Sequence, residues 1–202
     1  MIVHHQVFWP VNDSASQRRY VESLAALAAA LVATGDDVFF YGTQKDDRVT
    51  GAEIQAAMRS LTPSITPPPF VMPASVDELI DLSASADFLV TTRFHGAVFG
   101  VITARPILAI CYQGKTRQVL EAAGLAAHAI DLEEVSPERL RAAFDDLRAQ
   151  GGAVEARLRQ HGIDLRARLD RQYEEVAALL RLETRDASLP PSRQPEVTGA
   201  RT

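Results

Sequence analysis

Three side chains that can carry positive charge follow two apolar segments of the chain. Arg93 and His95 come directly after the apolar run at 86–92. Lys115 follows a second apolar run at 107–112 and is one of only two lysines in the sequence. In open parallel sheets, ligands bind beyond the carboxyl ends of the strands. Because guanidinium and ammonium groups bind carboxylates and phosphates, the trio predicts an anion site.

A cation at the start of a helix breaks a local rule, because it faces the positive end of the helix dipole. Thr91 or Thr92 stands where the N-cap of a helix belongs, which places Arg93 at or in the first turn. Residues that break such rules tend to be functional, and the same helix start favours a bound anion. The alternative is that Arg93 merely pairs with a surface acid such as Asp87.

Other titratable residues have competing structural interpretations. Asp13 follows the end of the first predicted strand and is a candidate substrate-binding base for an acceptor hydroxyl, although its position favours a helix-capping aspartate. His4 and His5 are adjacent in a strand and point to opposite faces, so they cannot jointly bind one metal ion. Asp46 and Asp47 lie in a polar segment that predicts a solvated loop.

Strands and helices alternate along the first two thirds of the chain. Short apolar strands are expected at about 2–8, 37–41, 70–71, 86–92, 107–112 and 128–131. Helices are expected between them, at about 14–34, 52–59, 75–84, 94–103 and 116–123. This alternation predicts βαβ units and an α/β fold, a Rossmann-like doubly wound parallel sheet. The sequence contains neither Gly-x-Gly-x-x-Gly nor a P-loop motif.

The last third of the chain has helical periodicity. An apolar stripe from Val154 to Leu180 repeats every eleven residues, which keeps it on one face of a long C-terminal helix. Gly162 interrupts this stripe, which favours packing on the chain's own domain over a coiled-coil partner. We expect a Rossmann-like donor-binding domain at 1–135, C-terminal helices packing on it at 136–185 and a disordered tail at 186–202.

The composition excludes several classes of protein. The 202 residues carry 21 basic and 26 acidic side chains, a formal net charge of −5, so nucleic acid is not an expected partner. The most apolar stretch, 97–112, contains Arg105 and Pro106 and is too polar to span a bilayer. The sequence does not open with the basic and then apolar segments of a secretory signal peptide, so we expect a cytoplasmic location. This location includes peripheral attachment to the inner face of the membrane. Cys111 is the single cysteine, and no metal site is predicted.

Two segments in register resemble the polysaccharide pyruvyl transferase family. That family carries an Arg-Leu-His motif after a strand, and residues 93–95 read Arg-Phe-His, with phenylalanine in place of leucine. A proline-led strand follows and ends in Tyr-x-x-Lys, which is similar to residues 106–115. Before it, Ala104-Arg105 replaces a common glycine-containing turn. The order of elements from about residue 2 to residue 182 also resembles the C-terminal half of the family.

The resemblance implies one lobe of a B-type glycosyltransferase fold. It also implies a transferase that moves a pyruvyl group from phosphoenolpyruvate to a sugar hydroxyl of a cell-surface polysaccharide or its precursor. Arg93, Phe94 and His95 are assigned to the donor site, with Lys115 as a further member. His95 would protonate the methylene carbon, Arg93 would hold an anionic group, and Lys115 would offset charge on the departing phosphate. The implied partners are phosphoenolpyruvate and a sugar or glycan-lipid acceptor, with no cofactor.

Because the resemblance covers the family's C-terminal half, we expect the N-terminal lobe to be missing and a second chain to supply it. Two other functions remain open. One is a lobe of a nucleotide-sugar glycosyltransferase or epimerase, which a carboxylate placed beyond a strand to bind ribose hydroxyls would favour. The other is a non-catalytic anion-binding half that needs a partner chain.

Overall fold

The computed structural model describes residues 13–179. The predicted strand at 2–8, with His4 and His5, and the predicted tail at 186–202 lie outside the described residues. The chain divides into two compact units, residues 1–163 and 164–202. The α-helices are α1 (Ser14–Ala33), α2 (Asp47–Leu61), α3 (Val76–Ser85), α4 (Phe94–Ile102), α5 (Gly114–Ala122), α6 (Pro137–Ala149) and α7 (Gly151–Leu179). The strands are β1 (Phe40–Tyr41), β2 (Phe70–Val71), β3 (Leu89–Thr91), β4 (Ile107–Cys111) and β5 (Ala129–Asp131), with 3₁₀ turns η2 (Ala126–His128) and η3 (Leu132–Glu134).

All strand pairs in the described part of the chain are parallel, so the predicted α/β architecture is confirmed at this level. β1 pairs with β2 in a two-stranded sheet, and β4 lies between β3 and β5 in a three-stranded sheet. Leu89 of β3 stands opposite Ile107 of β4. At the other end, Cys111 of β4 stands opposite Asp131 of β5. The carboxyl ends of the three strands therefore meet at one edge of the sheet.

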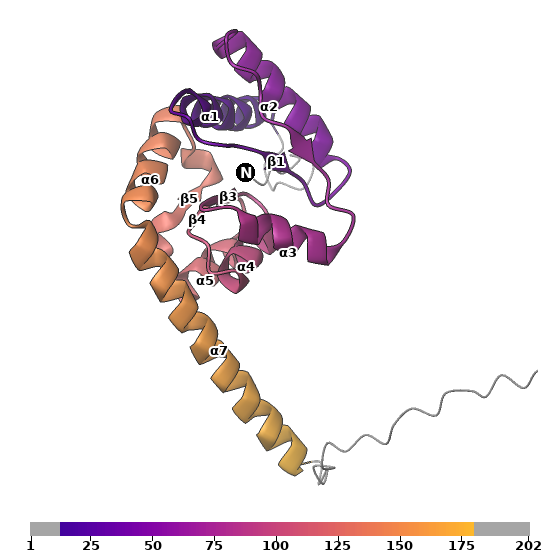
Figure 1. Cartoon of the computed structure of the whole chain (residues 1–202), viewed down its shortest axis with the longest axis vertical. Coiled ribbons are helices and arrows are strands. Elements are labelled where there is room, and N and C mark those ends of the chain that lie inside the picture. The colour runs from indigo at the N-terminus through magenta and orange to yellow at the C-terminus, as the bar shows by residue number, and fades with distance from the viewer. Residues whose placement is uncertain (1–12, 180–202) are drawn as a thin grey trace, which may run out of the picture. The chain divides into compact units, whose positions relative to one another are not determined.

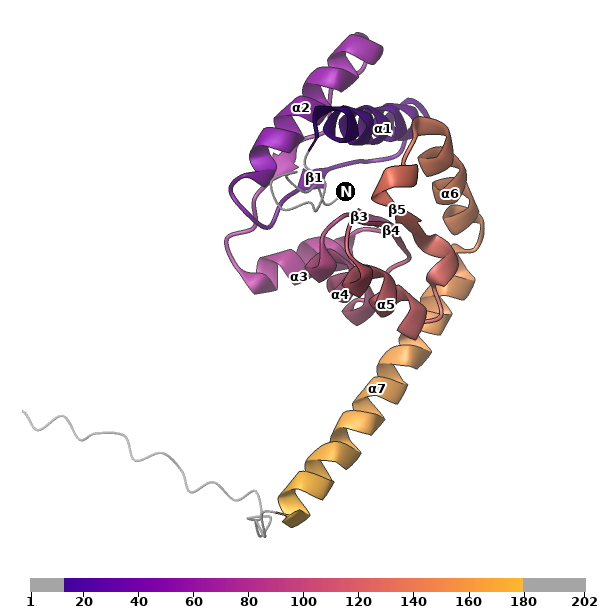
Figure 2. The ribbon, with the colours of Figure 1, turned by 180° about the vertical axis from the view of Figure 1, so that it is seen from behind.

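Helices cover the strands from two sides. Figures 1 and 2 show α1 and α2 on one side of the strands and α3, α4 and α5 on the other. All five residues of β4 are buried, which explains why this segment is a continuous apolar run instead of an alternating one. Phe144 of α6 and Val154 of α7 are buried in the same core as β4.

Local signals set several helix ends as predicted. Gly35 and Gly124 have φ of +88° and +71°, the left-handed conformation that commonly ends a helix. Ser75 caps α3, because its Oγ accepts a hydrogen bond of 3.1 Å from the Glu78 amide. The Glu78 carboxylate accepts one of 2.6 Å from the amide of Ala74, so the pair forms a capping box displaced by one residue.

The structure departs from the expected elements at two places. The strand expected at 37–41 is reduced to β1, and α2 begins five residues earlier than the expected 52. α7 continues through Gly162, so this glycine breaks the apolar stripe without ending the helix. Glycine costs an interior helix position only about 1 kcal/mol, which the flanking helix formers outweigh. Within residues 13–179, no helix has the length and apolarity needed to cross a membrane.

Candidate functional site

The start of α4 follows the carboxyl end of β3 after two residues. Arg93, with extended backbone, is the N-cap of α4 and makes no side-chain cap hydrogen bond. The prediction that Thr91 or Thr92 caps this helix is therefore wrong. Thr91 instead holds the turn, because its Oγ1 accepts a hydrogen bond from the Arg93 amide and donates one to the Arg93 carbonyl, both 3.1 Å long.

The predicted cationic residues meet at one cavity of about 390 Å³, the cationic cavity. Arg93, Phe94 and His95 reach it from the start of α4, and Lys115 reaches it from the first turn of α5. The other lining residues are Thr43, Gln44, Val76, Leu79, Phe99 and Tyr112. No lining residue in the described part of the chain carries a carboxylate, so the lining is electrostatically suited to an anion.

The Phe94 ring lies beside both exposed cationic candidates, Lys115 and His95. Lys115 Nζ lies 5.1 Å from the centroid of the Phe94 ring, a cation–π distance. The His95 ring meets the Phe94 ring edge to face, with centroids 5.5 Å apart. His95 and Lys115 are exposed, and Phe94 is half-buried. The phenylalanine that stands in place of leucine in the Arg-x-His segment therefore gives the lysine an aromatic face.

Arg93 forms an ion pair with a buried aspartate that the sequence pattern did not indicate as a site residue. Asp47 is fully buried, and its Oδ1 lies 2.5 Å from Arg93 Nη2, which also donates to Gln44 Oε1 at 3.1 Å. The other carboxylate oxygen, Oδ2, accepts hydrogen bonds from the amides of Thr43 (2.9 Å) and Gln44 (3.0 Å). The predicted solvated loop is thus wrong for Asp47, although Asp46 is exposed.

The alternative prediction for Arg93, an ion pair with a surface acid such as Asp87, is wrong, because Arg93 pairs with the buried Asp47. Arg93 and Asp47 connect the start of α4 to the start of α2, two segments 46 residues apart in sequence. The only local signal for Asp47 is an acid at the beginning of a helix, which Asp46 shares. Because Asp47 balances the guanidinium charge, the net positive charge of the cavity rests on Lys115, on the start of α4 and on His95 when protonated.

Asp13 does not line the cationic cavity. It is the N-cap of α1, where Oδ1 accepts a hydrogen bond of 2.7 Å from the Ser16 amide and Oδ2 one of 2.8 Å from the Ser16 hydroxyl. These hydrogen bonds hold the pKa of the Asp13 carboxyl below its usual value, the backbone amide contributing most. The capping alternative for Asp13 is confirmed.

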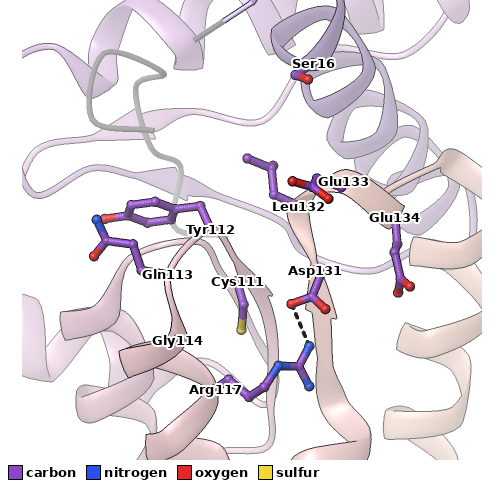
Figure 3. Close-up of a pocket in the computed structure, with 10 residues that line it drawn as sticks. All are labelled: Ser16, Cys111, Tyr112, Gln113, Gly114, Arg117, Asp131, Leu132, Glu133 and Glu134. Atoms are coloured by element: carbon purple, nitrogen blue, oxygen red, sulfur yellow. Dashed lines mark hydrogen bonds and ion pairs between the residues drawn. The ribbon is translucent and has the colours of Figure 1, made fainter. Parts of the chain in front are cut away.

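A second cavity of about 300 Å³, the acidic cavity, shares Tyr112 with the first and was not predicted from the sequence (Figure 3). Its lining residues are Ser16, Cys111, Tyr112, Gln113, Gly114, Arg117, Asp131, Leu132, Glu133 and Glu134. Arg117 Nη2 lies 2.7 Å from Asp131 Oδ1, and this hydrogen bond raises the pKa of Arg117. Burial raises the pKa of the Cys111 thiol to about 11, as expected of an inert core cysteine.

A model of the polysaccharide pyruvyl transferase family matches residues 10–114, more than half of the chain. The chain belongs to this family. The matched segment of this pyruvyl transferase family member contains the buried Asp47–Arg93 pair and residues 93–95, and it ends one residue before Lys115. β5 and the carboxylates that line the acidic cavity lie outside it. Within residues 13–179, no three His, Cys, Asp or Glu side chains are grouped so that they could hold a metal ion.

Proposed function

We propose that this chain binds phosphoenolpyruvate in the cationic cavity and transfers its pyruvyl group to a sugar hydroxyl of a cell-surface polysaccharide or its precursor. The observation that carries the proposal is the lining of this cavity, which has exposed His95 and Lys115 and no carboxylate among the described residues. Phosphoenolpyruvate carries a phosphate and a carboxylate, which together need at least two positive contacts. Membership of the family supports a transferase.

Each cationic group has a distinct proposed role in binding the donor. Lys115 binds the phosphate as a mobile point charge with three N–H donors. The start of α4 has no side-chain cap, so its first-turn amides provide further donors to an anion. Arg93 has only 9% of its side chain exposed, and its exposed edge contacts the donor carboxylate while Asp47 keeps it in place.

The proposed reaction conserves atoms and charge with His95 as the proton donor. The imidazolium of His95 gives a proton to the methylene carbon, and a sugar hydroxyl oxygen bonds to the adjacent carbon, C2. The proton of that hydroxyl returns to His95. A second hydroxyl of the same sugar then bonds to C2, while the C2–O bond to phosphate breaks and phosphate leaves with the electron pair and that hydroxyl's proton. The products are a pyruvyl ketal and inorganic phosphate.

The remaining expectations are proposals of the same kind. Parallel strands with cavities at their carboxyl ends support a Rossmann-like layer, which resembles one lobe of a B-type glycosyltransferase. The acceptor is a sugar or glycan lipid, and we propose that the reaction takes place in the cytoplasm, at or near the inner face of the membrane.

Thermal unfolding with ligands tests the donor. Phosphoenolpyruvate is expected to raise the melting temperature, because a ligand at 100 times its dissociation constant stabilises the folded state by about 2.7 kcal/mol. Lys115→Met is expected to abolish most of this rise. Lys45→Met is the matched control, since Lys45 is the other lysine, is exposed and does not line the cavity. Stabilisation by UDP-glucose and not by phosphoenolpyruvate would favour the nucleotide-sugar alternative.

Substitution of His95 tests the chemistry. His95→Gln is expected to keep the stabilisation by phosphoenolpyruvate and to lower pyruvyl transfer by about 10²- to 10⁴-fold, the usual contribution of a general acid. Transfer is measured as phosphate release and as the mass of the pyruvylated glycan. Full activity of His95→Gln would remove the proton-donor role. Binding of phosphoenolpyruvate by the wild type without transfer to any glycan would instead support the anion-binding alternative.

A further inference from the structure

The two cavities that share Tyr112 have opposite electrostatic character. Three carboxylates line the acidic cavity, from Asp131, Glu133 and Glu134, and its one cation in the described part of the chain is Arg117. Because Arg117 is paired with Asp131 at 2.7 Å, it is balanced before any ligand arrives. Phosphate or carboxylate groups of a ligand would meet repulsion here. The acidic cavity is therefore suited to a ligand without negative charge that donates hydrogen bonds.

We propose that the acidic cavity binds the neutral sugar that accepts the pyruvyl group, an inference that rests on the proposed function. Sugar hydroxyls donate hydrogen bonds, and carboxylates are the strongest side-chain acceptors for them. The volume of about 300 Å³ is at the lower end of small-molecule sites, which span about 300–1,000 Å³, and suits one sugar ring. Leu132 and Tyr112 provide apolar surface for the C–H faces of the ring.

The hydrogen bonds already made in the cavity decide which carboxylates are open to the sugar. Asp131 Oδ1 accepts a hydrogen bond from Arg117, which fixes the orientation of the carboxylate and leaves Oδ2 as an acceptor for a ligand (Figure 3). Glu134 is engaged by Arg139 at 2.7 Å. The Glu133 side chain has no hydrogen bond or ion pair with any residue in the range 13–179. Glu133 and Asp131 Oδ2 are thus the acceptors that we assign to the sugar.

The position of the acidic cavity fits a two-substrate site. It lies where β4 and β5 end, whereas the cationic cavity lies where β3 and β4 end. Tyr112, directly after β4, lines both. Because Tyr112 lines both cavities, the proposal places the sugar beside the donor, with its hydroxyls reaching the pyruvyl carbon past Tyr112.

Binding is tested without phosphoenolpyruvate, so that the result does not depend on turnover. Saturation-transfer NMR on the full chain uses methyl β-D-galactopyranoside, methyl β-D-glucopyranoside and methyl α-D-mannopyranoside as probes. We expect transfer to at least one of them, weakened about tenfold in affinity or more by Glu133→Gln, because a charge-assisted hydrogen bond is lost. Glu22→Gln, an exposed glutamate of α1 outside both cavities, is the matched control and is expected to bind like the wild type.

A second variant fills the space without changing its charge. A Cβ at Gly114 would meet no heavy atom within 4 Å, and Gly114 lines the acidic cavity but not the cationic one. Gly114→Leu is expected to abolish sugar binding while phosphoenolpyruvate still raises the melting temperature. Where the wild type transfers pyruvate, both variants should raise KM for the acceptor and leave KM for phosphoenolpyruvate unchanged.

Three results with the glycosides and in the kinetics would overturn the inference. They are the absence of binding for all three glycosides, glycoside binding that Glu133→Gln and Gly114→Leu leave intact, and a rise in KM for phosphoenolpyruvate instead of the acceptor. Competition by UDP-glucose that depends on Glu133 would also overturn it, because the cavity would then be a nucleotide site. If the wild type binds a glycoside in this cavity but transfers no pyruvate, the proposed function fails and the sugar site stands.

Discussion

Asp47→Asn tests the buried pair that positions the start of α4. The side chain of Asp47 is fully buried and that of Arg93 is 9% exposed. An asparagine can keep its oxygen toward the amides of Thr43 and Gln44, but its NH₂ then faces the donor Nη2 of Arg93. If the amide flips, it loses both backbone hydrogen bonds. Either arrangement removes the carboxylate charge that faces the buried guanidinium.

The expected loss is large for a single substitution. Removing one partner of a buried ion pair costs about 3–5 kcal/mol, whereas an exposed pair contributes about 0–1 kcal/mol. Since whole domains are stable by only about 5–15 kcal/mol, the variant should remain folded at low temperature with a melting temperature lower by about 6–20 °C. Urea unfolding followed by circular dichroism gives the free energy of unfolding. Asp46→Asn is the matched control, because Asp46 is exposed and makes no cap hydrogen bond.

A double-mutant cycle separates the ion pair from other effects. Asp47→Asn/Arg93→Met keeps an acceptor for the two amides and removes the guanidinium that has lost its carboxylate, so it should be more stable than the sum of the single losses predicts. The reasoning is refuted if Asp47→Asn costs less than about 1 kcal/mol, or if the two losses simply add. Asp47→Asn should also weaken stabilisation by phosphoenolpyruvate, which Asp46→Asn should not.

Two further predictions concern pH and packing. Burial lowers the pKa of His128; the charge of Asp146 opposes this with a smaller effect, and the charge of Arg157 lowers the pKa further. The unfolded chain therefore binds more protons, so the contribution of His128 to the free energy of unfolding is complete above about pH 6.5 and falls as the pH is lowered below it. In urea unfolding between about pH 7.5 and 5.5, His128→Gln should show a smaller fall than the wild type. An equal dependence on pH in both proteins would contradict the assignment. Gly100→Ala should lower the free energy of unfolding by about 1–3 kcal/mol, because its Cβ would lie 2.5 Å from Ile107 Cγ1, whereas Gly162→Ala, with no heavy atom within 4 Å, should raise it by up to about 1 kcal/mol. Equal effects of the two alanines on thermal unfolding would show that α4 does not need this close approach to β4.

Much of the fold follows from patterns that are local in sequence. The apolar runs, the capping box at Ser75 and the helix-ending glycines at 35 and 124 predicted the order of elements well. Strand lengths were less predictable, because a strand extends only as far as a neighbour pairs with it. β1 has two residues for this reason, although the apolar segment is longer.

The cationic cavity was predictable because parallel strands bring their carboxyl ends together. Arg93, His95 and Lys115 directly follow two apolar segments, and parallel pairing of β3 with β4 places them around one cavity. The role of Asp47 was not predictable, since nothing near it distinguishes it from Asp46. The acidic cavity was missed because its carboxylates follow a third strand and its first residue, Ser16, comes from α1.

By itself, the sequence determined the α/β class, the family and the cationic residues beyond the strands, because each depends on residue types at short spacing. Only the tertiary structure decided which of two adjacent aspartates is buried against Arg93, and that Tyr112 lines both a cationic and an acidic cavity. The physical reason is that burial and pairing energies depend on contacts between distant segments. Asp47, the first residue of α2, is buried where it pairs with Arg93 at the start of α4, and the hydrogen bonds from Arg93 and from the amides of Thr43 and Gln44 offset the cost of burying its charge.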